Sequence, residues 1–112
     1  MVVFIIPVYN EADNIQKLLM KTGEKMRQLA LPYKVILVDD GSSDSTVQMA
    51  QALADKVPLS IYSHYPNKGV GEAFRIGFIK ALETCNDSDI IITKEADNTS
   101  DLNIIEKLID KV

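Results

Sequence analysis

The chain has 112 residues, of which 46% are apolar and 25% charged, as expected for one soluble globular domain. Its formal net charge of −4 argues against a nucleic-acid partner, because nucleic-acid-binding modules carry a basic face. The single cysteine, Cys85, rules out an internal disulfide or a cysteine metal cluster. No apolar run approaches the roughly 18 residues that a membrane span needs.

The first part of the chain predicts a strand, a helix and a second strand. Val2–Ile6 is a continuous apolar run rich in β-branched residues, and Pro7 ends it. From residue 10 to about residue 30, apolar residues recur at helical spacing. We expect Asn10 to be the N-cap of this helix and Asp13 to lie in its first turn. Val35–Val38 then predicts a second, buried strand.

The remainder repeats the alternation. Apolar residues at helical spacing predict a second helix over 47–57, followed by a weaker strand at Leu59–Ser63. A third helix is predicted with the following residues around its core side: Ala73, Ile76, Gly77, Ile79, Lys80 and Leu82. Ile90–Thr93 predicts a fourth strand, covered on both faces because it is uniformly apolar. A final helix is predicted from residue 100 or 101 onward.

The predicted order is therefore βαβαβαβα, which indicates an α/β fold with a parallel sheet and right-handed crossovers. Ligands of such sheets bind beyond the carboxyl ends of the strands. Polar, acidic or glycine-rich segments follow each predicted strand, at residues 7–13, 39–44, 67–71 and 95–101. Their position predicts a binding site at this edge of the sheet.

The segment after the second predicted strand offers two acids, Asp39 and Asp40. A carboxylate at this place can accept hydrogen bonds from a nucleobase N–H group or a ribose hydroxyl. We therefore expect Asp40 to contact a ligand. We expect Asp44 instead to cap the following helix, because Asp is a preferred capping residue.

The last polar segment, Glu95-Ala96-Asp97, suggests a metal site. Two carboxylates at a spacing of two can address one cation, and carboxylate oxygens suit Mg²⁺ or Mn²⁺. Such an ion would offset the charge of a nucleoside diphosphate leaving group.

The third polar segment, at residues 67–71, opens a helix, where glycines permit the close approach of a phosphate. Lys68 and Arg75 are the cations that could reach such a ligand. His64 has no second His or Cys partner nearby, so a metal role is not expected. Tyr62 and Tyr65 are expected to serve packing.

With these four segments in place, the sequence resembles family 2 glycosyltransferases with the GT-A fold, in particular the polyprenol-phosphate (dolichol-phosphate mannose) synthase branch. Four stretches that together span the chain carry the resemblance: residues 6–11, residues 38–44, Asn67-Lys68-Gly69 with Arg75 and Gly77, and Glu95-Ala96-Asp97. The resemblance implies a GDP- or UDP-sugar donor, a divalent cation, and an acceptor such as a polyprenyl phosphate.

The resemblance also implies roles for individual residues. The base and ribose would lie against Pro7, Tyr9, Glu11, Val38 and Asp40, with Asp39 close by. Asp97 would be the main contact of the metal and diphosphate with residue 95 as its partner, and Ala96 would leave room for the donor. The catalytic base is expected outside this chain.

Two features depart from the family pattern. Glu95 stands where an Asp is usual, and its extra methylene moves the carboxylate outward. Family catalytic domains are also about twice this length, so we expect the donor-binding half of a larger domain. A sheet that ends on the fourth strand would leave an apolar edge, which predicts either an excised piece or self-association. The implied location is cytoplasmic, at a membrane surface for a polyprenyl phosphate acceptor.

Other functions fit the same alternation of elements. A nucleotidyltransferase shares the sheet but needs a basic, glycine-rich loop after the first strand, where this chain has Pro7-Val8-Tyr9-Asn10-Glu11. A non-catalytic nucleotide-binding or regulatory module fits the absence of an assigned base. A flavodoxin-like or receiver-like domain fits the fold pattern but finds weaker support in the acidic residues.

Overall fold

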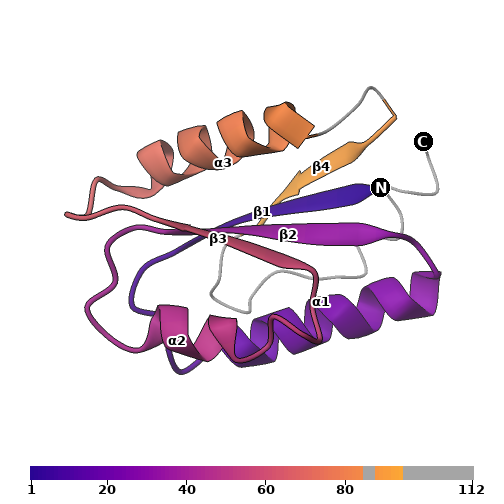
Figure 1. Ribbon diagram of the computed structural model, residues 1–112, viewed down its shortest axis with the longest axis horizontal. Helices are drawn as coiled ribbons and strands as arrows, with labels where there is room; N and C mark the ends of the chain where they lie inside the picture. The colour runs from indigo at the N-terminus through magenta and orange to yellow at the C-terminus, as the bar shows by residue number, and fades with distance from the viewer. Residues whose placement is uncertain (85–87, 95–112) are drawn as a thin grey trace.

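The computed structural model describes residues 1–84 and 88–94, which form a parallel sheet between helices (Figure 1). In chain order the elements are β1 (Val2–Val8), α1 (Ile15–Leu29), β2 (Tyr33–Asp39), α2 (Thr46–Gln51), β3 (Leu59–Ser63), α3 (Val70–Thr84) and β4 (Ile90–Thr93). The strands pair in the order β3-β2-β1-β4, and every pair is parallel. The predicted α/β alternation is thus confirmed for these seven elements, whereas Cys85 and the predicted last helix lie outside the described residues.

The central strand β1 is buried along its whole length, which explains its unbroken apolar sequence. Its register pairs Val2 with Tyr33 and Val8 with Asp39. Because successive side chains point to opposite faces, Phe4 and Ile6 enter the core beneath α1 and α2. Val3 and Ile5 enter the core beneath α3.

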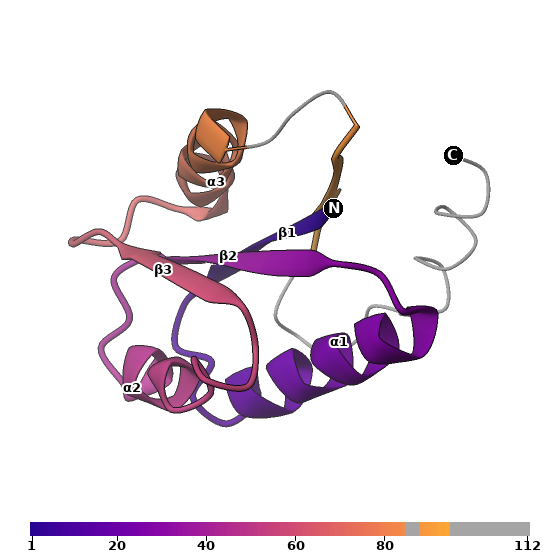
Figure 2. The ribbon, with the colours of Figure 1, turned by 45° about the vertical axis from the view of Figure 1, so that its right-hand side comes forward.

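The helices divide between the two faces of the sheet. Figures 1 and 2 show α1 and α2 together on one face and α3 on the other. Helix α3 approaches β1 closely through the small residues Ala73, Gly77 and Ala81, all of which are buried. A Cβ atom at Gly77 would lie 2.3 Å from Cγ2 of Ile5, so this crossing depends on a glycine.

Two predicted helix boundaries were wrong. Helix α1 begins at Ile15 with Asn14 at the N-cap position, and no acid lies in its first turn. Asn10 has a left-handed backbone (φ 52°), so it belongs to a turn before the helix and not to a helix cap. Helix α2 ends at Gln51, although turns beyond it still bury Leu53 and Val57 as the apolar pattern predicted.

The predicted packing was wrong at three residues and incomplete at one strand. Ile79 and Leu82 are 43% and 70% exposed, because the small-residue stripe of α3 faces the sheet in their place. Tyr65, expected to pack, is 82% exposed. Strand β4 lies at an edge of the described sheet, and its isoleucines are half-buried and not fully covered.

The loops after β1, β2 and β3 gather at one edge of the sheet, on the left in Figure 1. Three of the four predicted polar segments lie in these loops, and the fourth, at 95–101, falls outside the described residues. Within the described ranges, no helix is long and apolar enough to cross a membrane.

Candidate functional site

A pocket of about 260 Å³ opens at the carboxyl edge of the sheet. Three segments contribute its walls: the end of β1 with the residue after it, the residue after β2, and the loop that leads into α3 together with the first turn of that helix. Its lining residues are Pro7, Val8, Tyr9, Asp40, Asn67, Gly69, Val70 and Ala73. The wall is mostly apolar, and the side chain of Asp40 supplies its charge.

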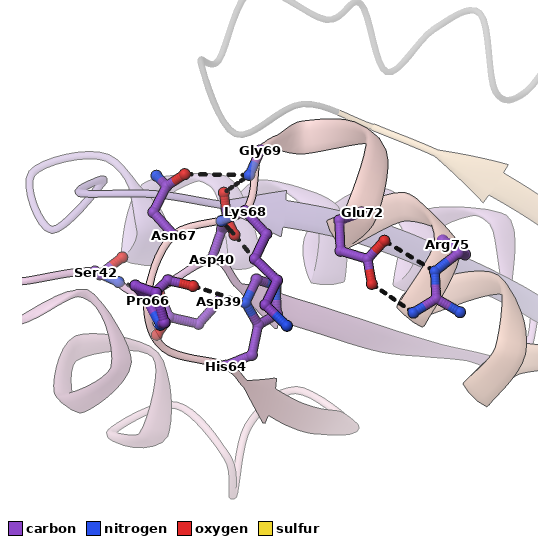
Figure 3. A network of polar contacts seen from close by, with 10 residues as sticks. All are labelled: Asp39, Asp40, Ser42, His64, Pro66, Asn67, Lys68, Gly69, Glu72 and Arg75. Atoms are coloured by element: carbon purple, nitrogen blue, oxygen red, sulfur yellow. Dashed lines mark hydrogen bonds and ion pairs between the residues drawn. The ribbon is translucent and has the colours of Figure 1, made fainter.

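Asp40 binds the loop that forms the opposite wall of the pocket. Its Oδ1 atom accepts the backbone N–H of Lys68 at 2.8 Å, and its Oδ2 atom accepts that of Gly69 at 2.8 Å (Figure 3). The residue is only 4% exposed, so these two donors replace much of its lost hydration. A carboxylate can accept about four hydrogen bonds, which leaves capacity for a ligand donor.

His64 lies on the far side of the same carboxylate. Its buried Nε2 atom lies 3.1 Å from Oδ1 of Asp40, a hydrogen-bond distance without hydrogen-bond direction. Its Nδ1 atom lies 3.4 Å from the carbonyl oxygen of Pro66.

Gly41 lets the loops after β2 and β3 come together. Its φ of 74° lies in the region that favours glycine, and a Cβ atom there would be 2.9 Å from the backbone nitrogen of Asn67. The sequence therefore places a glycine where the Asp40 turn touches the wall of the pocket.

Asp39 shapes the turn and does not line the pocket. It is 4% exposed, and its Oδ1 atom accepts the backbone N–H of Ser42 at 3.3 Å. Its backbone oxygen accepts the N–H of His64 at 3.1 Å, which extends the pairing of β2 with β3. Of the two neighbouring acids, only Asp40 faces the cavity.

The structure brings Pro7, Tyr9 and Asp40 together around the pocket. Two other predicted base-site residues lie elsewhere: Val38 is fully buried beneath α3, and Glu11 is half-buried, with its carboxylate accepting an N–H of Asn14. The sequence did not single out Val8, Val70 or Ala73 as lining residues, because an apolar side chain carries no sign of ligand contact in the sequence.

The two predicted cations do not line the pocket. Lys68 contributes its backbone N–H to Asp40. Arg75 is exposed and forms a forked ion pair with Glu72, one helical turn away on α3 (Figure 3). The hydrogen bonds from Arg75 hold the pKa of Glu72 below its ordinary value, and the bond to Glu72 raises the pKa of Arg75.

The predicted metal residues Glu95 and Asp97, with Ala96 between them, lie outside the described residues. Over residues 1–84 and 88–94, no three His, Cys, Asp or Glu side chains are grouped to hold a metal ion.

A parallel sheet with a pocket at the carboxyl ends of its central strands makes this an α/β domain of the ligand-binding kind. Comparison with known proteins identifies it as the N-terminal part of a GT-A fold. The chain belongs to glycosyl transferase family 2, whose model matches residues 3–112.

Two similar proteins illustrate its relatives. The chain is 34% identical over 107 residues to an undecaprenyl-phosphate 4-deoxy-4-formamido-L-arabinose transferase of Pseudomonas fluorescens, covering 96% of this chain and 30% of that protein. It is 32% identical over 108 residues to a dolichol-phosphate mannosyltransferase of Pyrococcus furiosus, covering 96% and 29%. The chain thus spans about a third of the length of these relatives.

Solved structures share the fold at lower identity. Residues 1–349 of S. aureus TarS in complex with UDP superpose with a TM-score of 0.75 at 22% identity, covering 98% of this chain and 32% of that one. The complex of the same protein with UDP-GlcNAc gives a TM-score of 0.73 at 23% identity, covering 98% and 31%.

Proposed function

We propose that the pocket beside Asp40 binds the nucleoside of a nucleoside-diphosphate sugar, and that the chain is the donor-binding part of a glycosyltransferase. The observation that carries the proposal is a buried carboxylate on the wall of an apolar pocket at the carboxyl edge of a parallel sheet. Apolar walls with a few placed polar groups are typical of small-molecule sites. A volume of about 260 Å³ suits part of such a ligand, with the diphosphate and sugar extending beyond it.

Each wall has a role in this proposal. The ring of Tyr9, 47% exposed at the rim, offers a face against which a base can stack. Asp40 uses its remaining acceptor capacity for a ring N–H or a ribose hydroxyl. UDP and UDP-GlcNAc are the ligands in the TarS complexes, and on this ground we favour a UDP-sugar over a GDP-sugar.

The proposed metal ion is supported by the sequence, and the proposed acceptor by the names of relatives. We infer from the sequence that Glu95 and Asp97 hold Mg²⁺ or Mn²⁺, which would supply positive charge to the diphosphate. The names of the two relatives above support a polyprenyl phosphate as acceptor. Such an acceptor would place the complete protein at a membrane surface.

Calorimetric titration with UDP and with GDP, each with and without Mn²⁺, tests the proposal. We expect UDP to bind more tightly than GDP. Asp40→Asn should weaken UDP binding by about tenfold or more, since a lost charged hydrogen bond costs roughly 1.5–3 kcal/mol. Asp97→Ala should abolish the effect of Mn²⁺.

Asp55→Asn is the matched control, because this exposed acid lies in the turns before β3, toward the opposite edge of the sheet. Its affinity for UDP should equal that of the wild type. Folded wild-type protein that binds neither nucleotide would overturn the proposal.

A further inference from the structure

The loops after β1 and β2 are joined by side-chain bonds that run in both directions. The side-chain oxygen of Asn10 accepts the backbone N–H groups of Ser43 at 2.9 Å and Asp44 at 3.4 Å. In return, the backbone N–H of Asn10 donates to Oγ of Ser42 at 2.9 Å. These bonds link residues more than 30 positions apart in the chain, so they fix one loop on the other.

Two further bonds continue the link toward the helices. The backbone N–H of Glu11 donates to Oγ1 of the fully buried Thr46 at 2.9 Å. The backbone N–H of Ala12 donates to Oδ2 of Asp44 at 3.2 Å, while Oδ1 of Asp44 accepts the N–H of Thr46 at 3.0 Å. Asp44, expected to be the cap itself, thus lies one residue before the N-cap Ser45, and its carboxylate binds both the first N–H of α2 and the β1 loop.

Asn10 combines two properties that few residues share. Its φ of 52° places it in the left-handed region, which Asn tolerates better than other residues that carry a side chain. Its amide oxygen supplies the acceptor for the opposite loop. The reversal of the chain at Asn10 comes directly after Tyr9, a residue of the pocket wall.

We propose that Asn10, Asp44 and Thr46 are positioning residues that hold Tyr9 and Asp40 at a fixed separation for the donor nucleotide. None of the three lines the pocket, but each is bonded to a loop that begins at a lining residue. A ligand that has to order two loose loops loses part of its binding energy to that ordering. The inference rests on the proposed function of the pocket.

Substitutions of Asn10 separate its two properties. Asn10→Gly keeps the left-handed turn and removes the acceptor, whereas Asn10→Asp keeps an acceptor oxygen at the same place. We expect Asn10→Gly to weaken UDP binding by about tenfold, because the ligand would then have to order the two loops. Asn10→Asp should stay within about threefold of the wild type.

The measurements are calorimetric titration with UDP, amide hydrogen exchange at Ser43 and Asp44, and the thermal unfolding midpoint. Exchange at both amides should accelerate in Asn10→Gly, and the midpoint should fall by several degrees while the protein stays folded at the titration temperature. Ser45→Ala is the control, because this exposed N-cap residue of α2 makes no side-chain cap bond.

The possible failures are distinct. Wild-type affinity in Asn10→Gly, with accelerated exchange, would overturn the positioning role and leave the proposed function intact. A loss in Asn10→Asp equal to that in Asn10→Gly would also overturn it, because the acceptor would not be what matters. A wild-type protein that binds no UDP would overturn the proposed function and this inference with it.

Discussion

At the scale of single residues, the carboxylate of Asp40 is organised by the backbone and not by a lysine or arginine. Two successive N–H groups and the edge of His64 surround it. Backbone donors are fixed by the path of the loop, so the acceptor is already oriented before a ligand arrives. The same bonds hold the backbone of Lys68 and Gly69 beside the pocket, which makes Asp40 part of the wall as well as the proposed ligand contact.

Asp44 makes the free energy of unfolding depend on pH. Burial alone would raise its pKa, but the hydrogen bonds from Thr46 and Ala12 outweigh this and hold the pKa below its ordinary value of 3.8. A lowered pKa in the folded state means that the ionised carboxylate stabilises the fold above pH 3.8. That stabilisation is lost as the pH falls through the lower, folded value.

We therefore expect wild type to exceed Asp44→Asn in free energy of unfolding near pH 6, by a small amount because this carboxylate is exposed to solvent. The difference should shrink as the pH falls below 3.8 and through the lower pKa of the folded state. Urea unfolding of both proteins across this range measures it. A difference that is constant with pH would contradict the account.

At the scale of elements, helix α3 borders the pocket with its first turn and packs closely on the sheet at Gly77. Gly77 lets the helix approach Ile5 of the central strand, whereas a Cβ atom added at Gly71 would meet open space. The two glycines lie on the same helix, so they form a matched pair for testing this contact.

Gly77→Ala should lower the free energy of unfolding by about 1–3 kcal/mol, because the added methyl group overlaps Ile5 and the helix has to move outward. Gly71→Ala should change it by less than about 1 kcal/mol, with stabilisation favoured by helix propensity. Chemical denaturation measures both. Equal effects of the two substitutions would show that the close crossing is not important for stability.

The sequence predicted those elements whose apolar pattern matches their packing. All four strands and the bodies of three helices followed from periodicity, and the acids after β2 marked the correct edge of the sheet. Helix α3 was less predictable, because small residues make its contact and larger apolar residues such as Leu82 stay exposed. The predicted core side of this helix therefore included the buried Ala73 and Gly77 correctly but extended too far, to Ile79 and Leu82.

The site was predicted in part for a similar reason. Pro7, Tyr9 and Asp40 stand beside strand ends, where the topology itself locates a ligand edge. The bond of Asn10 to residues 43 and 44 depends on a left-handed turn and on loops that are distant in the chain. The sequence around residue 10 was interpreted as a helix cap from its local pattern alone. In the structure, Asn10 instead makes a tertiary contact with the loop after β2.

At the scale of the whole molecule, the described part of the chain is one layer of sheet between two layers of helix, with the pocket at a single edge. The family match extends over residues 3–112, and the relatives above are about three times as long. In our proposal this chain supplies the nucleotide site. The metal residues at 95 and 97 belong to the same proposal and rest on the sequence.

The central claim is that the nucleotide enters the pocket between Tyr9 and Asp40. Amide chemical-shift mapping of the 112-residue chain during titration with UDP and Mg²⁺ tests it most directly. The account predicts the largest changes at Val8, Tyr9 and Asp40 and along residues 67–70, with little change across α1 and α2. Changes centred on the α1 and α2 face, or none at a saturating concentration of UDP, would contradict it.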